Sequence, residues 1–371
     1  MNIKPFQIER YFAKYEFTAP YLLSCSDCEP FTLKELLEYS DDETIKLWEN
    51  LWLGYTESQG HPKLRNEIST LYKNIEQDEI IELVPEEGIF ISMNCILEKD
   101  DHVITTFPSY QSLYQIAESI GCNISQWTPQ IKDGFNFEVS ALKSLITDKT
   151  KLIIMNFPHN PTGATIDKQS LNEIIELARK KNIYIFSDEM YRLLEYNEAQ
   201  RLEAVADLYE NGVSLSGMSK AFSLPGLRTG WLSTKNKVLM KKFIEFKDYT
   251  TICNSAPSEI LAIIALKAKN EIISRNLKII KSNLVILESF FDKYNEFLTW
   301  KQPNAGPIAF PELKAEMNIT DFAKKLVEEK GLMLLPSSVY GFSGNNFRLG
   351  FGRKNIEPML NILGNFLEEN F

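Results

Sequence analysis

The sequence predicts an α/β protein in which a mostly parallel sheet lies between helices. Two observations indicate this fold class. Short apolar segments such as LIIMNF and IYIFSD are typical of strands that are buried on both faces of a sheet. Amphipathic helical patterns alternate with these strands along the middle of the chain, and this order builds a parallel sheet covered by helices.

The alternating part begins at about residue 63. Its expected helices are Lys63–Lys73, Glu86–Leu97, Tyr110–Ser119, Val139–Ile146 and Lys168–Lys181. Its expected strands are His102–Phe107, Asn123–Thr128, Lys151–Asn156, Ile183–Ser187, Val213–Ser216 and Trp231–Ser233. Because such sheets bind ligands at the carboxyl ends of their strands, functional residues are expected at that edge.

Residues 1 to about 50 are expected to be irregular, apart from a helical stretch near Leu33–Tyr39. A long helical pattern from about 256 to 292 leads to a smaller α/β domain. That domain is predicted to contain strands Leu298–Lys301, Ile308–Phe310, Leu332–Leu335 and Phe347–Phe351, with helices Ile319–Lys330 and Ile356–Glu369. We therefore divide the chain into an N-terminal segment (1–50), a large domain (51–285) and a small C-terminal domain (286–371).

The composition is that of an ordinary globular protein, with 44% hydrophobic and 24% charged residues among 371. A net charge of -10 disfavours a surface for nucleic acid or anionic membranes, which needs clustered Lys and Arg. The N-terminal sequence lacks the apolar core of a signal peptide, and no apolar run is long enough to span a membrane. These features predict a cytoplasmic protein.

The five cysteines do not suggest a disulfide framework, because their number is odd and three of them lie far apart. Cys25 and Cys28 form a CxxC pair. A structural zinc site usually needs four ligands, and neither a second CxxC nor a paired-histidine motif accompanies this one. No metal site is therefore predicted.

Polar residues follow three successive predicted strands. Strand 151–156 runs into F-P-H-N-P-T-G, a rigid turn that presents the amide of Asn160. Strand 183–187 is followed by Asp188, with Tyr191 three residues later, and strand 213–216 ends just before Lys220. Taken singly, these residues are typical of a turn, a helix cap, a packed phenol and a solvated cation. Together they bring an amide, a carboxylate, a phenol and an amine to one edge of the sheet.

Lys220 lies in the stretch S-L-S-G-M-S-K-A-F-S-L-P-G-L-R-T-G-W, from Ser214 to Trp231. Arg228 follows it by eight residues, after Pro225 and Gly226. An amine after an apolar strand, followed by a turn and a cation, suits a lysine that holds a carbonyl compound with an anionic group.

With these motifs in this order, the sequence resembles the class I/II aminotransferases from about Tyr55 to Arg348. These are the fold-type I enzymes that use pyridoxal 5′-phosphate (PLP). The motifs that carry the resemblance are Gly54-Tyr55 with Gly60, Pro108-Ser109-Tyr110, Asn160-Pro161-Thr162-Gly163, Asp188 with Tyr191, Ser219-Lys220, Pro225-Gly226-Leu227-Arg228, and Arg348. The large domain would then bind PLP, and residues 1–50 would pack with the small domain at the substrate entrance.

The resemblance implies an aminotransferase (EC 2.6.1.-) that exchanges the amino group between an L-amino acid and a 2-oxo acid through a lysine aldimine. Lys220 would be the Schiff-base lysine and then the general base and acid. Asp188 would pair with the pyridinium nitrogen of the cofactor and keep it protonated. Asn160 and Tyr191 would hydrogen-bond the ring 3-oxygen, and Tyr110 would stack on the ring.

The resemblance also assigns the two anionic groups. Arg228 would bind the cofactor phosphate, with Ser219 as a hydroxyl donor and with a helix N-terminus near Glu86 and Glu87. Tyr55 would reach the phosphate of a neighbouring subunit, which implies a homodimer with shared active sites. Arg348, with Asn160, would bind the substrate α-carboxylate, for which the planar guanidinium provides a bidentate geometry that lysine lacks.

Two positions depart from the family pattern at the phosphate. The family usually has a Gly-Ala-Ser/Thr/Gln stretch at the phosphate loop, and this chain has Val84-Pro85-Glu86-Glu87-Gly88. Pro85 supplies no N–H, and carboxylates disfavour a nearby phosphate unless they point away. Gly217 stands three residues before Lys220, where a serine is common. Ser216 or Ser219 is a candidate replacement for that hydroxyl donor, with greater reliance on Arg228 as the other possibility.

The substrate is less constrained by the motifs. The stretch Tyr21–Phe31 lies where family members place a loop over the substrate side chain, and Asp27 and Glu29 bring negative charge there. We hypothesise a polar or cationic substrate side chain; an ordinary solvated loop is the alternative.

Other activities are also open. Capreomycidine-synthase-like members use the same fold and the same three residues, Lys220, Asp188 and Arg348, for elimination or cyclisation. A non-catalytic PLP-binding regulator is disfavoured by the acidic charge and by the absence of an added N-terminal domain. A Rossmann enzyme is disfavoured because no G-x-G-x-x-G follows a predicted strand.

Overall fold

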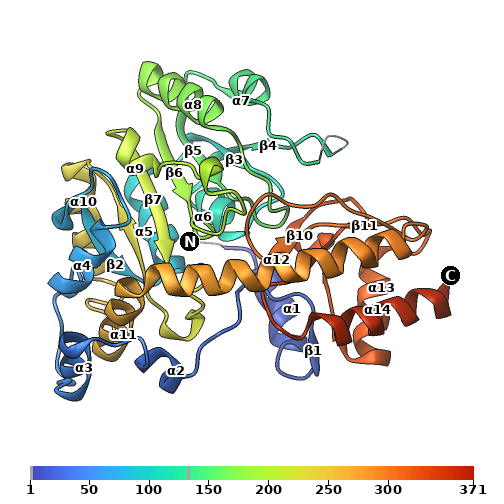
Figure 1. Cartoon of the computed structure of the whole chain (residues 1–371). Coiled ribbons are helices and arrows are strands. Elements are labelled where there is room, and N and C mark those ends of the chain that lie inside the picture. Colours follow the sequence, from blue (N-terminus) through green and yellow to red (C-terminus); the bar gives the residue numbers. More distant parts are fainter. Residues whose placement is uncertain (1–2, 132–133) are drawn as a thin grey trace.

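The computed structural model describes residues 3–131 and 134–371 (Figure 1). Its main feature is a seven-stranded sheet in the order β2-β8-β7-β6-β5-β3-β4, in which β8 is antiparallel to both neighbours and the other pairs are parallel. The strands are β2 (Ile80–Leu83), β3 (His102–Thr106), β4 (Asn123–Trp127), β5 (Thr150–Asn156), β6 (Tyr184–Asp188), β7 (Gly212–Gly217) and β8 (Gly230–Ser233). The predicted α/β class with a mostly parallel sheet is confirmed.

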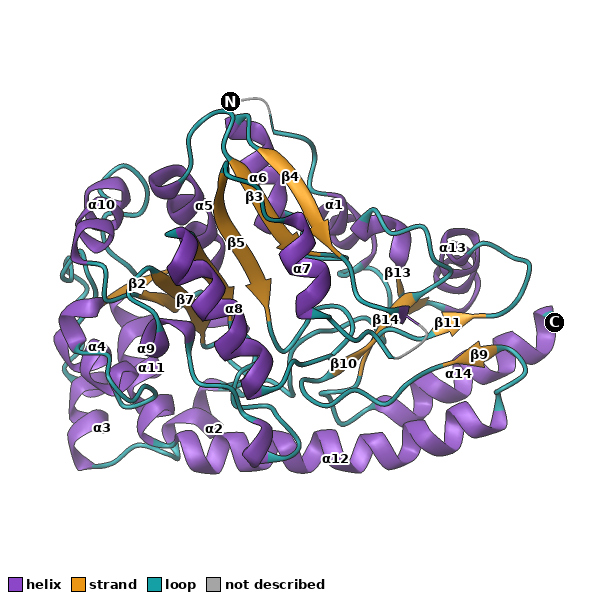
Figure 2. Cartoon of the chain, turned by 90° about the horizontal axis from the view of Figure 1, so that it is seen from above, coloured by secondary structure: helices purple, strands orange, loops and turns teal. Residues whose placement is uncertain are grey.

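Helices cover both faces of this sheet (Figure 2). In β5, Leu152 and Ile154 face α5 (Pro85–Ile96), α6 (Ser112–Ile120) and α10 (Lys237–Lys247). Ile153 and Met155 face the other way, towards α7 (Val139–Leu145), α8 (Lys168–Lys181) and α9 (Val205–Leu208). Burial of each of these side chains contributes roughly 1.5–3 kcal/mol to the free energy of unfolding. The alternation explains why LIIM is continuously apolar, since successive side chains enter two different cores.

Two helices lead away from the sheet, α11 (Ala256–Lys267) and the long α12 (Lys269–Lys293). Figure 2 shows α12 running along the molecule to the C-terminal part. The elements of that part are β9 (Leu298–Thr299), β10 (Ile308–Ala309), β11 (Glu312–Leu313), α13 (Ile319–Lys330), β12 (Leu332–Met333), β13 (Leu335–Pro336), β14 (Phe347–Gly350) and α14 (Ile356–Asn370). The predicted boundary at 285/286 falls inside α12, and the division into domains stays a prediction.

The helical stretch expected near Leu33–Tyr39 is present as α2 (Leu33–Leu37), but the expectation that the rest of the N-terminal segment is irregular is wrong. The segment also contains α1 (Gln7–Tyr15) and α3 (Asp42–Glu49), and α4 (Pro62–Ser69) follows it. In α1, Ile8 and Tyr15 lie seven residues apart and are both buried, so the helix is fixed by one packed face. In α3, Asp41 accepts a hydrogen bond from the Thr44 N–H at 2.8 Å and caps the helix.

The N-terminal segment also joins the C-terminal part directly. The short strand β1 (Tyr21–Leu22) pairs in parallel with β12, so residues more than 300 positions apart in the sequence are neighbours. Residues 22–28 are thereby held beside β14 and the carboxyl edge of the large sheet. Within the described part of the chain, no helix combines the length and the apolar composition needed to cross a membrane.

Candidate functional site

A cavity of about 420 Å³ lies at the carboxyl edge of the large sheet, between that edge, α1 and β14. It contains most of the residues that the sequence analysis predicted for the site. The predicted residues that line it are Lys220, Asp188, Tyr191, Asn160, Tyr110, Arg228, Ser219, Glu86 and Arg348. Glu87 and Tyr55 do not line it.

The ends of β5 and β6 are cross-linked beside this cavity. Asn156, the last residue of β5, pairs in register with Asp188, the last residue of β6. Its side chain donates to the Asp188 carbonyl oxygen at 3.0 Å and accepts from the Asn160 N–H at 2.7 Å. Asn156 therefore fixes both the backbone of Asp188 and the turn that carries Asn160, and the sequence analysis had not singled it out.

Asp188 is a buried carboxyl group with one oxygen free. Its Oδ1 accepts a hydrogen bond from the Met190 N–H at 3.1 Å. No hydrogen bond reaches Oδ2 from the described residues. Burial raises the pKa of Asp188 to about 6, and the Met190 hydrogen bond and the charge of Lys220 oppose this shift only in part. Asp188 thus presents one acceptor oxygen to the cavity.

Lys220 follows β7 and is held by a residue of the N-terminal segment. Its Nζ donates to the Ser26 hydroxyl at 2.7 Å and lies 6.0 Å from the centre of the Tyr191 ring. Burial lowers the pKa of Lys220, although the charge of Asp27 opposes the shift. A lysine in this environment releases its proton more readily than one in water, which makes its amine more available as a nucleophile.

Tyr191 contacts the main chain of the same serine, Ser26. The buried Tyr191 hydroxyl donates to the Ser26 carbonyl oxygen at 3.0 Å, and burial raises its pKa. Ser26 therefore positions two of the predicted site residues. Sequence reasoning missed it, although it lies in the Tyr21–Phe31 stretch that had been noted for its charges.

Arg348, on β14, is a buried cation whose hydrogen-bond partners are all neutral. It donates twice to the Ser24 carbonyl oxygen, at 2.9 and 3.3 Å, once to the Tyr340 hydroxyl at 2.9 Å, and once to the Asn160 Oδ1 at 3.3 Å. Its side chain forms no ion pair with any carboxylate of the described residues. A buried cation without a counter-ion at the edge of a cavity suits an anionic ligand.

Helix α1 covers the opposite side of the cavity with Glu9, Phe12 and Glu16. Glu9 accepts from the Tyr110 hydroxyl at 2.8 Å, and the Phe12 ring lies 5.8 Å from the Arg348 guanidinium carbon. These three residues share a face of α1 at helical spacing. They were missed because the helix itself was missed.

The negative charge that the sequence analysis attributed to Asp27 and Glu29 is largely paired. Asp27 lines the cavity but accepts two hydrogen bonds from Arg353, at 2.9 and 3.2 Å. Glu29 lies outside the cavity and accepts from the Lys354 N–H at 2.9 Å. By contrast, Glu16 receives no side-chain hydrogen bond from the described residues, and burial raises its pKa. Glu16 is therefore the acidic group most available to a ligand.

The two positions that depart from the expected phosphate pattern, Pro85 and Gly217, pack against each other. A Cβ atom on Gly217 would lie 3.0 Å from the Gly230 Cα and 3.2 Å from the Pro85 Cγ. A Cβ atom on Gly230 would lie only 2.7 Å from the same Pro85 atom. The proline at the start of α5 thus occupies the space over the paired glycines of β7 and β8.

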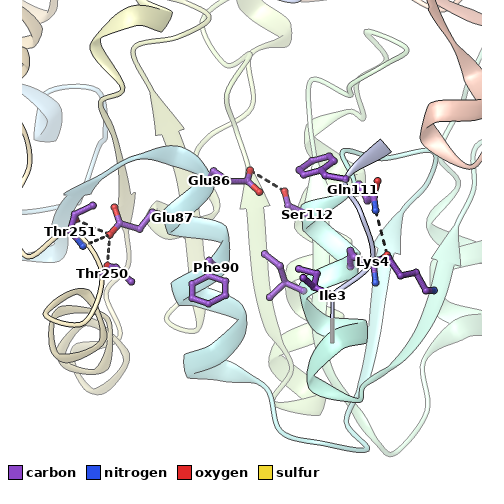
Figure 3. Close-up of a pocket in the computed structure, with 12 residues that line it drawn as sticks. Ile3, Lys4, Glu86, Glu87, Phe90, Gln111, Ser112, Thr250 and Thr251 are labelled. Atoms are coloured by element: carbon purple, nitrogen blue, oxygen red, sulfur yellow. Dashed lines mark hydrogen bonds between the residues drawn. The ribbon is translucent and has the colours of Figure 1, made fainter. Parts of the chain in front are cut away.

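Glu86 and Glu87, the next two residues of α5, point to different sides (Figure 3). Glu86 lines the cavity, and its Oε2 accepts from the Ser112 hydroxyl at 3.1 Å. Glu87 accepts from the Thr251 N–H at 3.2 Å and from the hydroxyls of Thr250 and Thr251, and it also caps α5 through the Val84 N–H at 3.2 Å. The structure therefore places Glu86, but not Glu87, where a ligand of the cavity can reach it.

The remaining predicted residues differ in exposure. Ser219 is buried at the cavity wall. Arg228 follows η4 (Pro225–Leu227), has its backbone in the left-handed region with a φ of 54°, and donates to the Pro225 carbonyl oxygen at 3.2 Å. Tyr55 is 89% exposed and points to no part of this cavity. Arg228 forms no ion pair in the described part of the chain.

The CxxC cysteines do not assemble a metal site in the described residues. Both are free thiols; Cys25 lines the cavity and Cys28 is buried. Burial raises the pKa of Cys25 to about 11 and that of Cys28 to about 12. Both thiols are therefore weak nucleophiles near neutral pH.

Comparison with known proteins gives the family. A family model described as aminotransferase class I and II matches residues 30–362. Capreomycidine synthase of Streptomyces vinaceus is 26% identical over 71% of this chain and 67% of its own length. A probable aspartate aminotransferase of Methanocaldococcus jannaschii is 26% identical over 85% of each chain.

A solved structure agrees with these sequence relationships. The crystal structure of a PLP-dependent aminotransferase from Streptococcus suis superimposes with a TM-score of 0.93 at 28% identity, and the match covers 100% of this chain and 99% of the other. The fold is thus the fold-type I aminotransferase fold. The family match, the fold and the residues of the cavity agree, and the chain belongs to the class I and II aminotransferases.

Proposed function

We propose that this aminotransferase exchanges the amino group between an L-amino acid and a 2-oxo acid, with PLP held in the cavity at the carboxyl edge of the sheet. The observation that carries the proposal is that Lys220, Asp188 and Arg348 line one cavity. They supply an amine for an aldehyde, an acceptor for a ring N–H and a cation for a carboxylate.

The residues at the ring end of the cavity fit PLP. The Oδ2 of Asp188 has no protein partner among the described residues and suits the pyridinium N–H. The lowered pKa of Lys220 suits an amine that bonds covalently to an aldehyde. Asn160 and Tyr191 are proposed to hydrogen-bond the ring 3-oxygen, and Tyr110 is proposed to cover the ring face.

When bound, PLP supplies an electron sink for the negative charge that develops at the substrate Cα. Asp188 would keep the ring nitrogen protonated by accepting its hydrogen bond. The Nζ of Lys220 would move the proton between the substrate Cα and the C4′ carbon of the cofactor. This amine lines the cavity beside Tyr191 and Ser26. Arg348 would orient the substrate by binding its α-carboxylate.

At the other end, we propose that Arg228 and Ser219 bind the cofactor phosphate. Both line the cavity, and the Arg228 guanidinium makes only one hydrogen bond to the described residues, so its remaining donors are free.

We further propose a homodimer in which Tyr55 completes the phosphate site of the partner. Trp52, Leu53 and Tyr55 are 78%, 79% and 89% exposed, and three large exposed side chains within four residues are typical of an interface. We also propose a domain boundary at 285/286 and a cytoplasmic location. The five cysteines are free thiols, which supports a cytoplasmic location because disulfides are rare in that compartment.

The central assignment is tested by incubating the protein with PLP, reducing it with borohydride and mapping the labelled peptide. The label should be on Lys220, should be lost in Lys220→Ala, and should persist in Lys235→Ala. Lys235 is the matched control because its amine binds the Asp207 carbonyl oxygen away from the cavity. A label on another lysine would refute the proposed role of Lys220.

A second reaction is supported by one observation, the similarity to a capreomycidine synthase. The same three residues would serve a lyase or cyclase reaction, because proton removal from Cα is common to both routes. Product analysis separates the two. Transamination yields a keto acid and leaves the cofactor in its amine form, whereas elimination or cyclisation leaves it as the aldehyde.

A further inference from the structure

We propose that Glu86 binds the cofactor phosphate as a protonated carboxyl group, so that PLP is bound together with one proton. This inference rests on the proposed function and deepens it at the phosphate end of the same cavity. It gives a role to the residue that departs most clearly from the expected phosphate loop.

The phosphate end of the cavity offers few donors. Pro85 begins α5 and has no N–H, so it removes one of the free donors at the helix N-terminus. Gly217 has no hydroxyl, and its close approach to Gly230 and Pro85 leaves little room for one. Arg228, Ser219 and the N–H groups of Glu86 and Glu87 remain for a phosphate here, and one more side-chain donor would strengthen its binding.

Glu86 is the side chain that lies at this end of the cavity. Glu86 projects from the first turn of α5 into the cavity that contains Arg228 and Ser219. Its Oε2 is fixed by the Ser112 hydroxyl at 3.1 Å, as Figure 3 shows, while no described residue hydrogen-bonds Oε1. The fixed side chain thus leaves one oxygen for a ligand. A protonated carboxyl carries an O–H donor, whereas a carboxylate only accepts.

Glu86 lies among more acidic than basic groups. From α1, the end of β6 and the loop after η4 it is faced by Glu9, Asp188 and Arg228. The Tyr110 phenol also lies near it, Ser112 contacts it from α6, and Lys4 lies across a second cavity of about 390 Å³ but is paired with Glu118. Two of these three nearest charged groups are acidic, so ionised Glu86 would be a third carboxylate beside one arginine.

Burial is the largest cause that raises the pKa of Glu86 to about 7, and the Ser112 hydrogen bond opposes it. Near neutral pH the group therefore exists in both forms. A dianionic phosphate favours the protonated form, because that form donates a hydrogen bond and removes a like charge. The proton comes from solvent, and no covalent bond to the protein changes.

The sign of the pH dependence follows from this linkage. Below the pKa of the free protein, Glu86 already carries the proton and binding needs none. Above it, each bound PLP takes up one proton, so affinity falls about tenfold per pH unit. Glu86→Gln keeps the shape of the side chain and supplies an N–H donor, but it does not titrate. The PLP affinity of this variant should therefore lack this part of the pH dependence.

The test measures the dissociation constant of PLP by equilibrium dialysis at pH 6 to 9, for the wild type and for Glu86→Gln. The ratio of the two constants removes the ionisations of PLP and of Lys220, which both proteins share. The ratio of the wild-type dissociation constant to that of Glu86→Gln should rise by more than about tenfold between pH 7 and 9. Glu118→Gln, which changes a surface glutamate on α6 paired with Lys4, is the matched control and should give a flat ratio.

Pyridoxal, which lacks the phosphate, locates the effect. For pyridoxal, the ratio of the wild-type to the Glu86→Gln dissociation constant should stay constant over the same pH range. A flat ratio for PLP would overturn the proposal, and so would an equal rise for pyridoxal, since Glu86 would then act at the ring end. If Glu86→Gln does not fold, calorimetry of the wild type at pH 8 gives the answer: PLP should take up about one proton more than pyridoxal, and equal uptake would overturn the proposal.

These outcomes are separable from failure of the proposed function. If PLP does not label Lys220, the proposed function fails. If PLP labels Lys220 and the ratio is flat, only the role of Glu86 fails.

Discussion

The Arg348 guanidinium donates a hydrogen bond to the Tyr340 hydroxyl at 2.9 Å, and this phenol in turn donates to the Asn160 Oδ1 at 3.2 Å. The three side chains come from β14, the η5 turn (Ser337–Tyr340) and the turn after β5. They hold a buried positive charge in a fixed orientation without neutralising it. The expected substrate group for this charge is the α-carboxylate.

Arg348→Lys should therefore raise KM for the amino acid roughly tenfold or more, because lysine cannot form the bidentate pair and a charge-assisted hydrogen bond contributes about 1.5–3 kcal/mol. Tyr340→Phe keeps the charge and removes one partner, so its KM should rise less. Steady-state kinetics with thermal unfolding as the folding control measures both. An unchanged KM in Arg348→Lys would move the carboxylate site elsewhere.

Asp188→Asn should lower kcat by orders of magnitude, because an amide at this position cannot keep the pyridinium nitrogen charged. Labelling of Lys220 by PLP and borohydride should persist, since the amine is untouched. The two measurements together separate loss of the electron sink from loss of the cofactor. Near-normal turnover in this variant would contradict the proposed role of Asp188.

Glu16→Gln should reduce kcat/KM for arginine and lysine by roughly threefold to tenfold, the size of a partly exposed ion pair, and leave phenylalanine and alanine nearly unchanged. The reason is that Glu16, like Asp188, has no side-chain hydrogen-bond partner among the described residues, and Asp188 is assigned to the cofactor, whereas Asp27 is paired with Arg353. Transamination rates for these four amino acids and aspartate check this. A clear preference of the wild type for aspartate would rule out a cationic substrate.

A separate prediction concerns stability. Glu82 is fully buried, and burial, with the adjacent Glu259 carboxyl group, raises its pKa well above the usual value, while Lys247 opposes the shift. Because the folded-state pKa exceeds the unfolded one, its contribution to stability is present at low pH and is lost as pH rises towards the folded pKa. The slope is up to about 1.4 kcal/mol per pH unit.

Glu82→Gln removes this titration, so its thermal unfolding midpoint should fall less between pH 6 and 9 than that of the wild type. Glu245→Gln, an exposed position on α10, serves as the control and should follow the wild type. If the unfolding midpoints of Glu82→Gln and the wild type change in parallel with pH, the Glu82–Glu259 pair does not destabilise the protein at high pH.

The parts of the fold that the sequence predicted well are those with local signals. Helices α8 and α13 have the predicted bounds, because each begins at a capping residue, Asp167 or Asn318, and ends before a left-handed residue, Asn182 or Gly331. Strand β5 was found within one residue of its bounds because most of it is continuously apolar, and β6 and β7, which end at the same edge, were also found within one residue. In these helices and strands the local sequence alone specifies the secondary structure.

The missed parts depend on contacts distant in sequence. Strand β2 and the two-residue β1 exist through their pairing with β8 and β12, and nothing within four residues marks them. In the same way, Ser26 lies 194 residues from Lys220, and no motif links the two. Glu9 reaches Tyr110 across 101 residues from a helix that carries no side-chain cap.

Pro85 lies against both Gly217 and Gly230, and this has a consequence for how the chain can be altered. A Cβ atom at 217 would lie 3.0 Å from the Gly230 Cα and 3.2 Å from the Pro85 Cγ, so a serine there needs a shift of a few tenths of an ångström on both sides. A smaller residue at 85 relieves only the contact with the proline, because the Gly230 backbone stays in place. The residues at 85 and 217 are therefore coupled, and a serine at 217 is accommodated more easily when residue 85 is exchanged together with it.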